Sequence, residues 1–412
     1  MTISAPLVIV GASYAGTQLA ASARELGFDA PILMFGDEPH LPYQRPPLSK
    51  GLLTGKTTVD QLELRSPDFF SSNSIELRRG VRVTGIDAAA CTITLADGSR
   101  HPYGWLALTT GARCRELPVP GAKLNGVHQL RTLDDALRIA DALARSERAC
   151  VIGGGFIGLE VASALRTRGA QITVIESLPR LLARTFPEQM SDYVRQAHTQ
   201  RGIGFEFGHG VKALHGASRV EAVELDDGRR IACDMVVLGI GVVPNVELAA
   251  QAGLALDNGI VTDALGRSSD SRILAVGDVA NMALPSIPGR PARARLESIQ
   301  AANDGARTAA TTLVGRNQPF TCIPWFWSDQ FDLKFQMAGI AMPGDTPVLR
   351  GDMTQDRFSV FYLRDGVIVA AHSVNRPAEH MQSRKLIAAG ARITAQQLTD
   401  ADYDLKSALG SA

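Results

Sequence analysis

The feature that most constrains this chain is an internal repeat of a strand, a glycine turn and a helix. The segment LVIVGASYAGTQLAASARELG at 7–27 aligns with ACVIGGGFIGLEVASALRTRG at 149–169, and three glycines of each copy fall at matching positions. In both copies another apolar run follows, at 31–35 and at 171–175. A strand, a glycine turn, a helix and a second strand form the nucleotide-binding half of a doubly wound α/β domain. The repeat therefore predicts two dinucleotide-binding domains in one chain.

The two copies also agree further along the chain. A polar turn at Asp97 leads to an apolar run that ends at Gly111, and a second turn at Asp227 leads to a run that ends at Gly241; both intervals span 14 residues. The positions of the helix, the hairpin and the strand all agree between the two copies, and such an agreement is not expected by chance. Two copies of one Rossmann-like architecture are the economical interpretation.

The remainder of the chain follows a different pattern. After Asn245 we expect a strand that ends at Gly277 and a helix over 296–313, and we expect this segment to return to the first domain. From Pro319 onward alternating apolar strands precede a helix near 379–389, which indicates a smaller α+β domain. The predicted domains are the first nucleotide domain at 1–113 and 245–320, the second at 114–244, and the C-terminal domain at 321–412.

The glycines of the second copy match the fingerprint G-x-G-x-x-G at Gly153, Gly155 and Gly158. Side chains at these positions would block a pyrophosphate from the backbone N–H groups and from the positive end of the helix. Glu176 follows 23 residues after Gly153, where a carboxylate can bind the hydroxyls of a ribose. These features predict dinucleotide binding; a close-packed glycine turn is the alternative.

The first copy departs from this fingerprint. Ser13 stands where the second glycine is expected, between Gly11 and Gly16, and its hydroxyl can donate to a phosphate. The string GASYAG also approaches the G-x-S-x-G elbow of hydrolases, but Ala15 replaces the last glycine. No acid and histidine follow in a recognisable context, so we expect a nucleotide turn here and not a nucleophile.

Acidic side chains after each repeat bear on the choice of nucleotide. Asp37 or Glu38 is the ribose candidate of the first copy, and a solvated turn is the alternative for at least one of them. In the second copy, a phosphate on the ribose would be repelled by the Glu176 carboxylate. At a separation of about 4 Å, each unit of like charge would cost roughly 4 kcal/mol. Arg180 and Arg184 lie just beyond and could offset this cost. We expect a preference for NADH over NADPH.

Composition excludes several classes of protein. Lys plus Arg and Asp plus Glu number 42 each, so no net field draws the chain toward nucleic acid or an anionic membrane. The five cysteines are widely spaced and odd in number, unlike a disulfide framework, which favours a reducing cytoplasm. Six residues precede the first apolar run and no uncharged stretch reaches 18 residues, so we expect no secretion signal and no membrane span.

Eight specific motifs carry a resemblance to a known family over nearly the whole chain. They are PYQRPPLSK (42–50), TTGAR (109–113), LRTLDDA (130–136), GGGFIGLE (153–160), GIGVVPN (239–245), AVGD (275–278), RLES (295–298) and PWFWSDQ (324–330). With them the chain resembles the FAD-dependent ferredoxin reductases of bacterial cytochrome P-450 and aromatic-ring dioxygenase systems.

The resemblance implies that FAD and NADH occupy the two nucleotide domains. FAD would lie on the Gly11 turn, with its ribityl chain held by Asp278 and its phosphates and ring lined by Arg45, Lys50, Arg113 and Arg131. Lys50 and Glu160 are implied to form an ion pair beside the ring, with Glu160 near the nicotinamide; a surface lysine and a helix-face carboxylate are the alternatives. The other cofactor-binding residues that we expect are Val83, Thr110, Gly111, Phe156, Ile157, Arg184, Gly241, Gly277, Glu297, Ser298 and Trp327.

The cysteines and histidines narrow the chemistry further. A flavoprotein disulfide reductase needs a redox dithiol such as CxxC, and the chain contains none. A flavin peroxidase of this superfamily would need a cysteine near Ser49, and that segment has none. The eight histidines show no ligand spacing, so we expect no metal. Electrons must then leave for an external acceptor.

The expected acceptor is a separate ferredoxin-type [2Fe–2S] protein or a rubredoxin that feeds a cytochrome P-450 or a dioxygenase. Such carriers are usually acidic, and the basic candidates for docking are Arg307, Arg316, Lys334, Arg384 and Lys385. Two alternatives stay open: an NADH-dependent reductase of another acceptor, such as a small quinone, and a redox-sensing protein resembling apoptosis-inducing factor. We expect a monomer or a weak homodimer.

Overall fold

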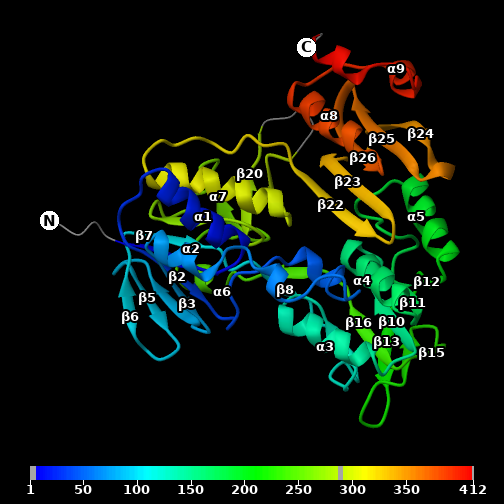
Figure 1. Cartoon of the computed structure of the whole chain (residues 1–412), viewed down its shortest axis with the longest axis horizontal. Coiled ribbons are helices and arrows are strands. Elements are labelled where there is room, and N and C mark those ends of the chain that lie inside the picture. Colours follow the sequence, from blue (N-terminus) through cyan, green and yellow to red (C-terminus); the bar gives the residue numbers. More distant parts are fainter. Residues whose placement is uncertain (1–5, 286–290, 411–412) are drawn as a thin grey trace.

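A computed structural model describes residues 6–285 and 291–410 of the chain. Its first domain is built on a parallel five-stranded sheet of order β19-β7-β1-β2-β3 (Figure 1). The strands are β1 (Leu7–Val10), β2 (Ile32–Gly36), β3 (Ile75–Arg79), β7 (Trp105–Leu108) and β19 (Ile273–Ala275). Strand β19 comes from the part of the chain after 245, so this segment does return to the first sheet.

Two helices lie side by side over this sheet, α1 (Tyr14–Glu25) and α7 (Ile299–Leu313) (Figure 1). Both present small residues, and Ala20 and Ala309 are fully buried in their common core. Helix α7 begins three residues later than we expected, because the Ser298 hydroxyl accepts from the Ala301 N–H and caps it there. Residues 296–298 have no regular structure, and the chain before them forms β21 (Arg293–Arg295), which pairs with β20 (Ala280–Ala283), itself beside β18 (Ile260–Thr262).

The two predicted hairpins are present. The Asp97 turn joins β5 (Thr92–Leu95) to β6 (Arg100–Pro102) beside β4 (Val83–Asp87), and the chain then enters β7. The Asp227 turn joins β14 (Ala222–Leu225) to β15 (Arg230–Ala232) beside β13 (Val211–His215), and the chain then enters β16. The first domain also includes α2 (Pro67–Ser72) and α6 (Glu247–Gln251).

The second domain repeats the architecture of the first. Its parallel sheet has the order β12-β11-β10-β16-β9. The strands are β9 (Val127–Gln129), β10 (Arg148–Ile152), β11 (Gln171–Glu176), β12 (Ile203–Phe207) and β16 (Met235–Leu238), and the helices are α3 (Leu133–Leu143), α4 (Phe156–Thr167) and α5 (Glu188–Gln200). Strand β10 and helix α4 stand where β1 and α1 stand in the first domain.

The third domain is an antiparallel sheet of order β22-β23-β26-β25-β24 with α8 packed on it (Figure 1). Its elements are β22 (Trp325–Gln330), β23 (Leu333–Gly339), β24 (Thr346–Asp352), β25 (Arg357–Arg364), β26 (Val367–Val374), α8 (Pro377–Ala388) and α9 (Ala395–Thr399). The expected strands and helix are present. Strand β24 was not anticipated, because Pro347 and Gly351 interrupt its apolar pattern.

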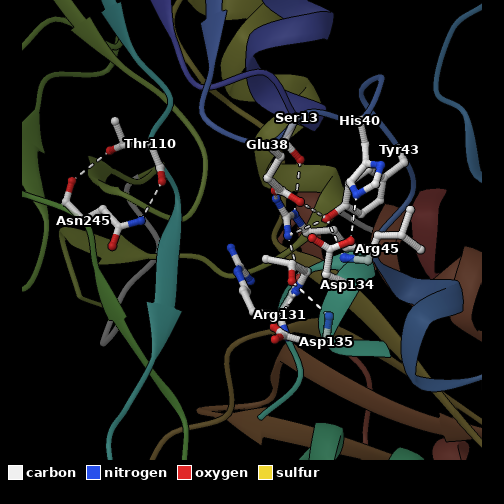
Figure 2. A network of polar contacts seen from close by, with 12 residues as sticks. Ser13, Glu38, His40, Tyr43, Arg45, Thr110, Arg131, Asp134, Asp135 and Asn245 are labelled. Atoms are coloured by element: carbon white, nitrogen blue, oxygen red, sulfur yellow. Dashed lines mark hydrogen bonds and ion pairs between the residues drawn. The ribbon is translucent and has the colours of Figure 1, made fainter. Parts of the chain in front are cut away.

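Two short strands cross between the nucleotide domains. β8 (Ala112–Cys114) and β17 (Val242–Pro244) form an antiparallel pair, so the predicted limits at 113 and 244 fall inside this crossover. Beside it, the Thr110 hydroxyl donates to the Asn245 carbonyl oxygen and the Asn245 amide donates to the Thr110 carbonyl oxygen, both at 2.8 Å (Figure 2). The crossover fixes where the two halves meet.

The second and third domains share a hydrophobic core. Phe186 precedes α5 and Met190 lies in it. Both pack against Phe335, Phe358 and other residues of the antiparallel sheet. Burying aromatic side chains on both sides stabilises the contact. Within 6–285 and 291–410, none of the helices combines the length and the apolar character that crossing a bilayer requires.

Candidate functional site

A cavity of about 1030 Å³ is lined by residues of all three domains. It opens where the parallel strands β1 and β10 end, at the glycine turns of the two repeats. Ligands of open α/β sheets bind at the carboxyl ends of the strands. Its volume lies at the upper end of the range for small-molecule sites, as two extended nucleotides would require.

The glycine turns have no room for side chains. Gly11 has φ +117°, and a Cβ there would lie 2.2 Å from the Thr109 carbonyl oxygen. Gly153 has φ +110°, and its Cβ would lie 2.4 Å from the Gly239 oxygen. One turn into each helix, a Cβ on Gly16 or Gly158 would lie 2.1 Å from the oxygen of the first glycine. The glycines thus let each helix start close against the strand, with its N-terminal N–H groups facing the cavity.

In the first copy, Ser13 replaces the second glycine of the fingerprint, and its side chain is hydrogen-bonded to an arginine. Ser13 precedes α1 in an extended conformation, and its hydroxyl accepts from Arg45 Nε at 3.3 Å. The Arg45 guanidinium also pairs with Glu38 at 2.7 Å and donates to the Arg131 carbonyl oxygen (Figure 2). Tyr43 donates to the other Glu38 oxygen at 2.5 Å. This network places a half-buried cation beside the glycine turn, where a pyrophosphate would need one.

Glu38 and Asp37 both line the cavity but differ in their surroundings. Glu38 is half-buried and held by Tyr43 and Arg45, whereas Asp37 is exposed. The ordered carboxylate is the better ribose acceptor, because its position is already fixed. Tyr14 faces the same part of the cavity, and burial raises the pKa of its phenol to about 12, so it stays a hydrogen-bond donor at neutral pH.

A second cation, Arg131, lies next to Arg45. Arg131 pairs with Asp278 at 2.8 Å, and both residues line the cavity. Arg131 is held by its own backbone, because its N–H donates to the Asp135 carboxylate at the start of α3 (Figure 2). Asp278 follows Gly277, whose φ of +81° turns the chain into the cavity. The predicted Arg131 and Asp278 thus form a contact pair on one wall of the first nucleotide site.

In the second copy, Glu176 is fixed by the main chain. One carboxylate oxygen accepts from the Gly154 N–H at 2.7 Å and the other accepts from the Leu178 N–H at 2.8 Å. The charge therefore stays at the end of β11, where the ribose of a nucleotide on the Gly153 turn would lie. A phosphate on that ribose would meet this fixed negative charge.

The two arginines that follow have different surroundings. Arg180 does not line the cavity, because its guanidinium donates to the carbonyl oxygens of Ala183 and Phe186 and to Ser191. It is therefore no counter-charge for a ribose phosphate, contrary to what its sequence position suggests. Arg184 lines the cavity, as does His209 across from it.

Lys50 and Glu160 form the ion pair that we expected, with Nζ and Oε2 separated by 2.7 Å. Glu160 is only 3% exposed, on the buried side of α4. The Ser49 hydroxyl donates to Oε2 at 2.5 Å and the Ser328 hydroxyl donates to Oε1 at 2.6 Å. Both residues of the pair line the same cavity as the two glycine turns.

Trp327 lines the cavity from the third domain. On the same face of β22, Trp325 lies 5.8 Å from it between ring centroids, and the Arg384 guanidinium stands 4.5 Å over the Trp325 ring. The strand thus carries two neighbouring aromatic rings from the cavity toward the cation of α8.

Most of the predicted site residues line this one cavity. These are Gly11, Ser13, Ala15, Asp37, Glu38, Arg45, Lys50, Thr110, Gly111, Arg113, Arg131, Gly153, Gly155, Phe156, Ile157, Glu160, Glu176, Arg184, Gly241, Gly277, Asp278, Glu297, Ser298 and Trp327. Gly16 and Gly158 lie behind it and act through helix packing. Val83 differs from the prediction: strand alternation turns its side chain into the core of the first domain, so it does not line the cavity.

Several residues of the site were missed from sequence. Ser49 and Ser328 contact Glu160, and Tyr14 and His209 line the cavity. Ser49 and Ser328 sit inside motifs singled out above, but nothing in a serine's position indicates a contact across domains. Within the described ranges, no cluster of three His, Cys, Asp or Glu side chains has the arrangement of a metal site.

The donor set fits two dinucleotides. Each repeat offers a helix N-terminus with room for a phosphate and a fixed carboxylate for a ribose, and the first adds Arg45 and Arg131. Gly155 lines the cavity, and a Cβ there would meet no protein atom within 4 Å. The glycine is therefore not required by packing within the protein, and it leaves space that a bound phosphate can use.

Comparison with known proteins agrees with this geometry. Residues 5–306 match the family described as pyridine nucleotide-disulphide oxidoreductase, and residues 325–409 match a reductase C-terminal family. Rhodocoxin reductase of Rhodococcus erythropolis is 44% identical over 404 residues, which cover 98% of this chain and 94% of that protein. The ferredoxin–NAD(+) reductase component of the anthranilate 1,2-dioxygenase system of Burkholderia cepacia is 42% identical, covering 98% of this chain and 99% of that protein.

A solved structure of a related protein has the same fold as this chain. The covalent putidaredoxin reductase–putidaredoxin complex superimposes with a TM-score of 0.95 at 36% identity, covering 100% of this chain and 99% of that chain. The fold and the site define a flavin- and pyridine-nucleotide-dependent oxidoreductase. The chain belongs to the pyridine nucleotide-disulphide oxidoreductase family. The predicted fold class and the predicted cofactors, FAD and NAD(H), are confirmed.

Proposed function

We propose that this protein oxidises NADH and passes the electrons through FAD to a small ferredoxin-type iron–sulfur protein or rubredoxin. The observation that carries the proposal is the single cavity in which both glycine turns, the Lys50–Glu160 pair and Trp327 meet. FAD supplies the redox chemistry, since a flavin accepts two electrons from a nicotinamide and releases them singly. The protein supplies binding, orientation and charge.

The residues divide this work between the two nucleotide domains. Arg45 and Arg131 neutralise the pyrophosphate of FAD, and Asp278 orients its ribityl hydroxyls. Glu176 selects NADH through its fixed charge. Lys50 places a cation at the meeting point of the two sites, where it stabilises negative charge that develops on the reduced ring.

The third domain suits the exit of electrons. Trp327 reaches the cavity and Trp325 continues along β22 to Arg384, a basic residue suited to an acidic carrier. Relatives named for dioxygenase and redoxin systems support this direction. We infer that the carrier serves a cytochrome P-450 or a dioxygenase, and that the protein acts in the cytoplasm, where its five free cysteines stay reduced.

The test is carrier-dependent turnover. The purified holoenzyme with NADH and a [2Fe–2S] ferredoxin should bleach the iron–sulfur absorbance under anaerobic conditions, and Trp327→Ala should slow this step more than it slows reduction of the flavin. A small quinone serves as the competing acceptor. Fast turnover with the quinone and none with any ferredoxin or rubredoxin would contradict the proposal.

A further inference from the structure

The carboxylate of Glu160 is held by groups from the two other domains. Glu160 itself lies on α4 of the second domain, and its Oε2 receives the Ser49 hydroxyl and the Lys50 ammonium from the first. Its Oε1 receives the Ser328 hydroxyl from β22 of the third domain. A carboxylate that is 3% exposed needs such donors, because burial of an unpaired charge is costly. Ser328 is the donor that acts on Oε1.

The direction of the Ser328 hydroxyl is set by its neighbour. Gln330 Nε2 donates to Ser328 Oγ at 3.0 Å, so the Ser328 proton is left to point at Glu160. Both side chains are fully buried on the same face of β22, two residues apart. The chain of hydrogen bonds from Gln330 through Ser328 to Glu160 is therefore ordered.

The position of the Lys50 ammonium depends on this carboxylate. Its contact with Glu160 is 2.7 Å, whereas its contacts with the Pro46 carbonyl oxygen and with Ser49 Oγ are 3.4 and 3.5 Å. A side chain with four rotatable bonds is ordered chiefly by its strongest contact. If Glu160 turns, Lys50 loses that contact and the cavity loses a fixed cation.

We propose that Ser328 is a positioning residue for hydride transfer: it fixes the Glu160 carboxylate and, through it, the Lys50 ammonium at the meeting point of the two nucleotide sites. The inference rests on the proposed function. It assigns the third domain a part in reduction by NADH, besides the part that Trp327 plays in the exit of electrons. One strand, β22, then serves both half-reactions.

The test compares Ser328→Ala with the wild-type holoenzyme in anaerobic stopped-flow reduction by NADH. The limiting rate of flavin reduction should fall about tenfold, the size expected for one hydrogen bond to a charged group. The NADH concentration at half-maximal rate should stay within about twofold, because Ser328 does not touch the nucleotide turn. Ser328→Thr keeps the hydroxyl and should recover most of the rate.

A matched control separates this role from general packing. Ser373 is 1% exposed in the same sheet, where its hydroxyl donates to Ser359 Oγ at 2.8 Å, because the Ser359 proton is already donated to Glu379. Ser373→Ala should leave the reduction rate unchanged. A crystal structure of Ser328→Ala gives a readout independent of activity, in which the Glu160 carboxylate should rotate and its distance to Lys50 Nζ should lengthen.

The outcomes are distinguishable from failure of the proposed function. If NADH does not reduce the wild-type flavin, the proposed function fails. If the wild type is reduced and Ser328→Ala matches it in rate, with Glu160 unmoved in the crystal, the positioning role is overturned. A rate loss in Ser373→Ala equal to that in Ser328→Ala would also overturn it, because the effect would then be one of packing.

Discussion

Glu176, the ribose candidate of the second site, is held by backbone N–H groups, whereas Glu38 in the first site is held by the side chains of Tyr43 and Arg45. Glu176 receives one N–H from the glycine turn and one from the residue two positions further on, Leu178. A carboxylate fixed in this way does not move aside for a phosphate. The same residue therefore orders the turn and chooses between nucleotides.

Replacing Glu176 tests that choice. Glu176→Gln removes the charge and keeps one acceptor, so kcat/KM with NADPH should rise about tenfold relative to that with NADH. Steady-state kinetics with both nucleotides gives the ratio. Glu188→Gln is the control, since Glu188 lies at the start of α5 and does not line the cavity. A ratio that is unchanged in Glu176→Gln would assign selectivity to other groups, such as Arg184.

His198 makes stability depend on pH. It is fully buried in α5, donates its Nδ1–H to the Val194 carbonyl oxygen, and has its pKa lowered to about 4, chiefly by burial. The unfolded chain, with a histidine pKa near 6.5, binds a proton that the folded chain does not. Stability is therefore present above about pH 6.5 and is lost as the pH falls toward 4.

Between pH 7.5 and pH 5 this single group should cost about 2 kcal/mol of unfolding free energy. Urea unfolding at the two pH values, in the wild type and in His198→Gln, isolates that difference. The variant should lose less stability on acidification than the wild type. Equal losses in both proteins would show that His198 does not carry this pH dependence.

Among elements, the C-terminal segment that follows α8 is held by its apolar contacts with the core of the third domain and by one arginine side chain. Each of the five N–H donors of Arg350 has a partner: Glu379 and the carbonyl oxygens of Leu398, Asp400, Ala401 and Tyr403. Glu379 in turn accepts from Arg376 and Ser359. A buried, fully satisfied guanidinium of this kind orders the loop and helix α9 against β24.

Loss of that side chain should loosen the segment. Arg350→Gln leaves several carbonyl oxygens and Glu379 without their donor, at a cost of about 3 kcal/mol or more. Hydrogen exchange should accelerate over 395–410 and stay unchanged in α1. Arg392→Gln, which removes a single exposed hydrogen bond to the Asp365 carbonyl oxygen, is the control. Exchange that rises equally in both variants would contradict this account.

Elements were predictable where their pattern is local. Both repeats, their hairpins and the return of the chain to the first sheet follow from glycine and apolar spacing. The start of α7 was placed three residues early because the Ser298 cap, and not the apolar Leu296, sets where the helix begins. Strand β24 was missed because its pairing with β25 depends on tertiary contact and not on its own sequence.

The whole molecule brings distant motifs to one cavity. The resemblance placed Lys50 beside Glu160, although 110 positions separate them, and the fold brings them to 2.7 Å. Contacts between domains were harder to foresee, since no spacing rule joins Ser49 or Ser328 to Glu160. Val83 was misplaced for a related reason, because which face of β4 meets the core depends on the packing of the domain.

The shared core of the second and third domains has a functional consequence. Packing between α5 and the antiparallel sheet fixes β22 relative to the NADH site. Arg201 at the end of α5 adds ion pairs with Asp332 and Asp356 of the third domain. The NADH domain and β22 therefore form one packed unit, and FAD would lie between this unit and the first domain.

The most direct test of the central claim is an anaerobic titration of the purified holoenzyme with NADH and, separately, with NADPH, followed by flavin absorbance. The account predicts that stoichiometric NADH bleaches the flavin rapidly and that NADPH does so far more slowly. Absence of bound flavin, or a flavin that neither nucleotide reduces, would contradict the assignment of this cavity to NADH oxidation.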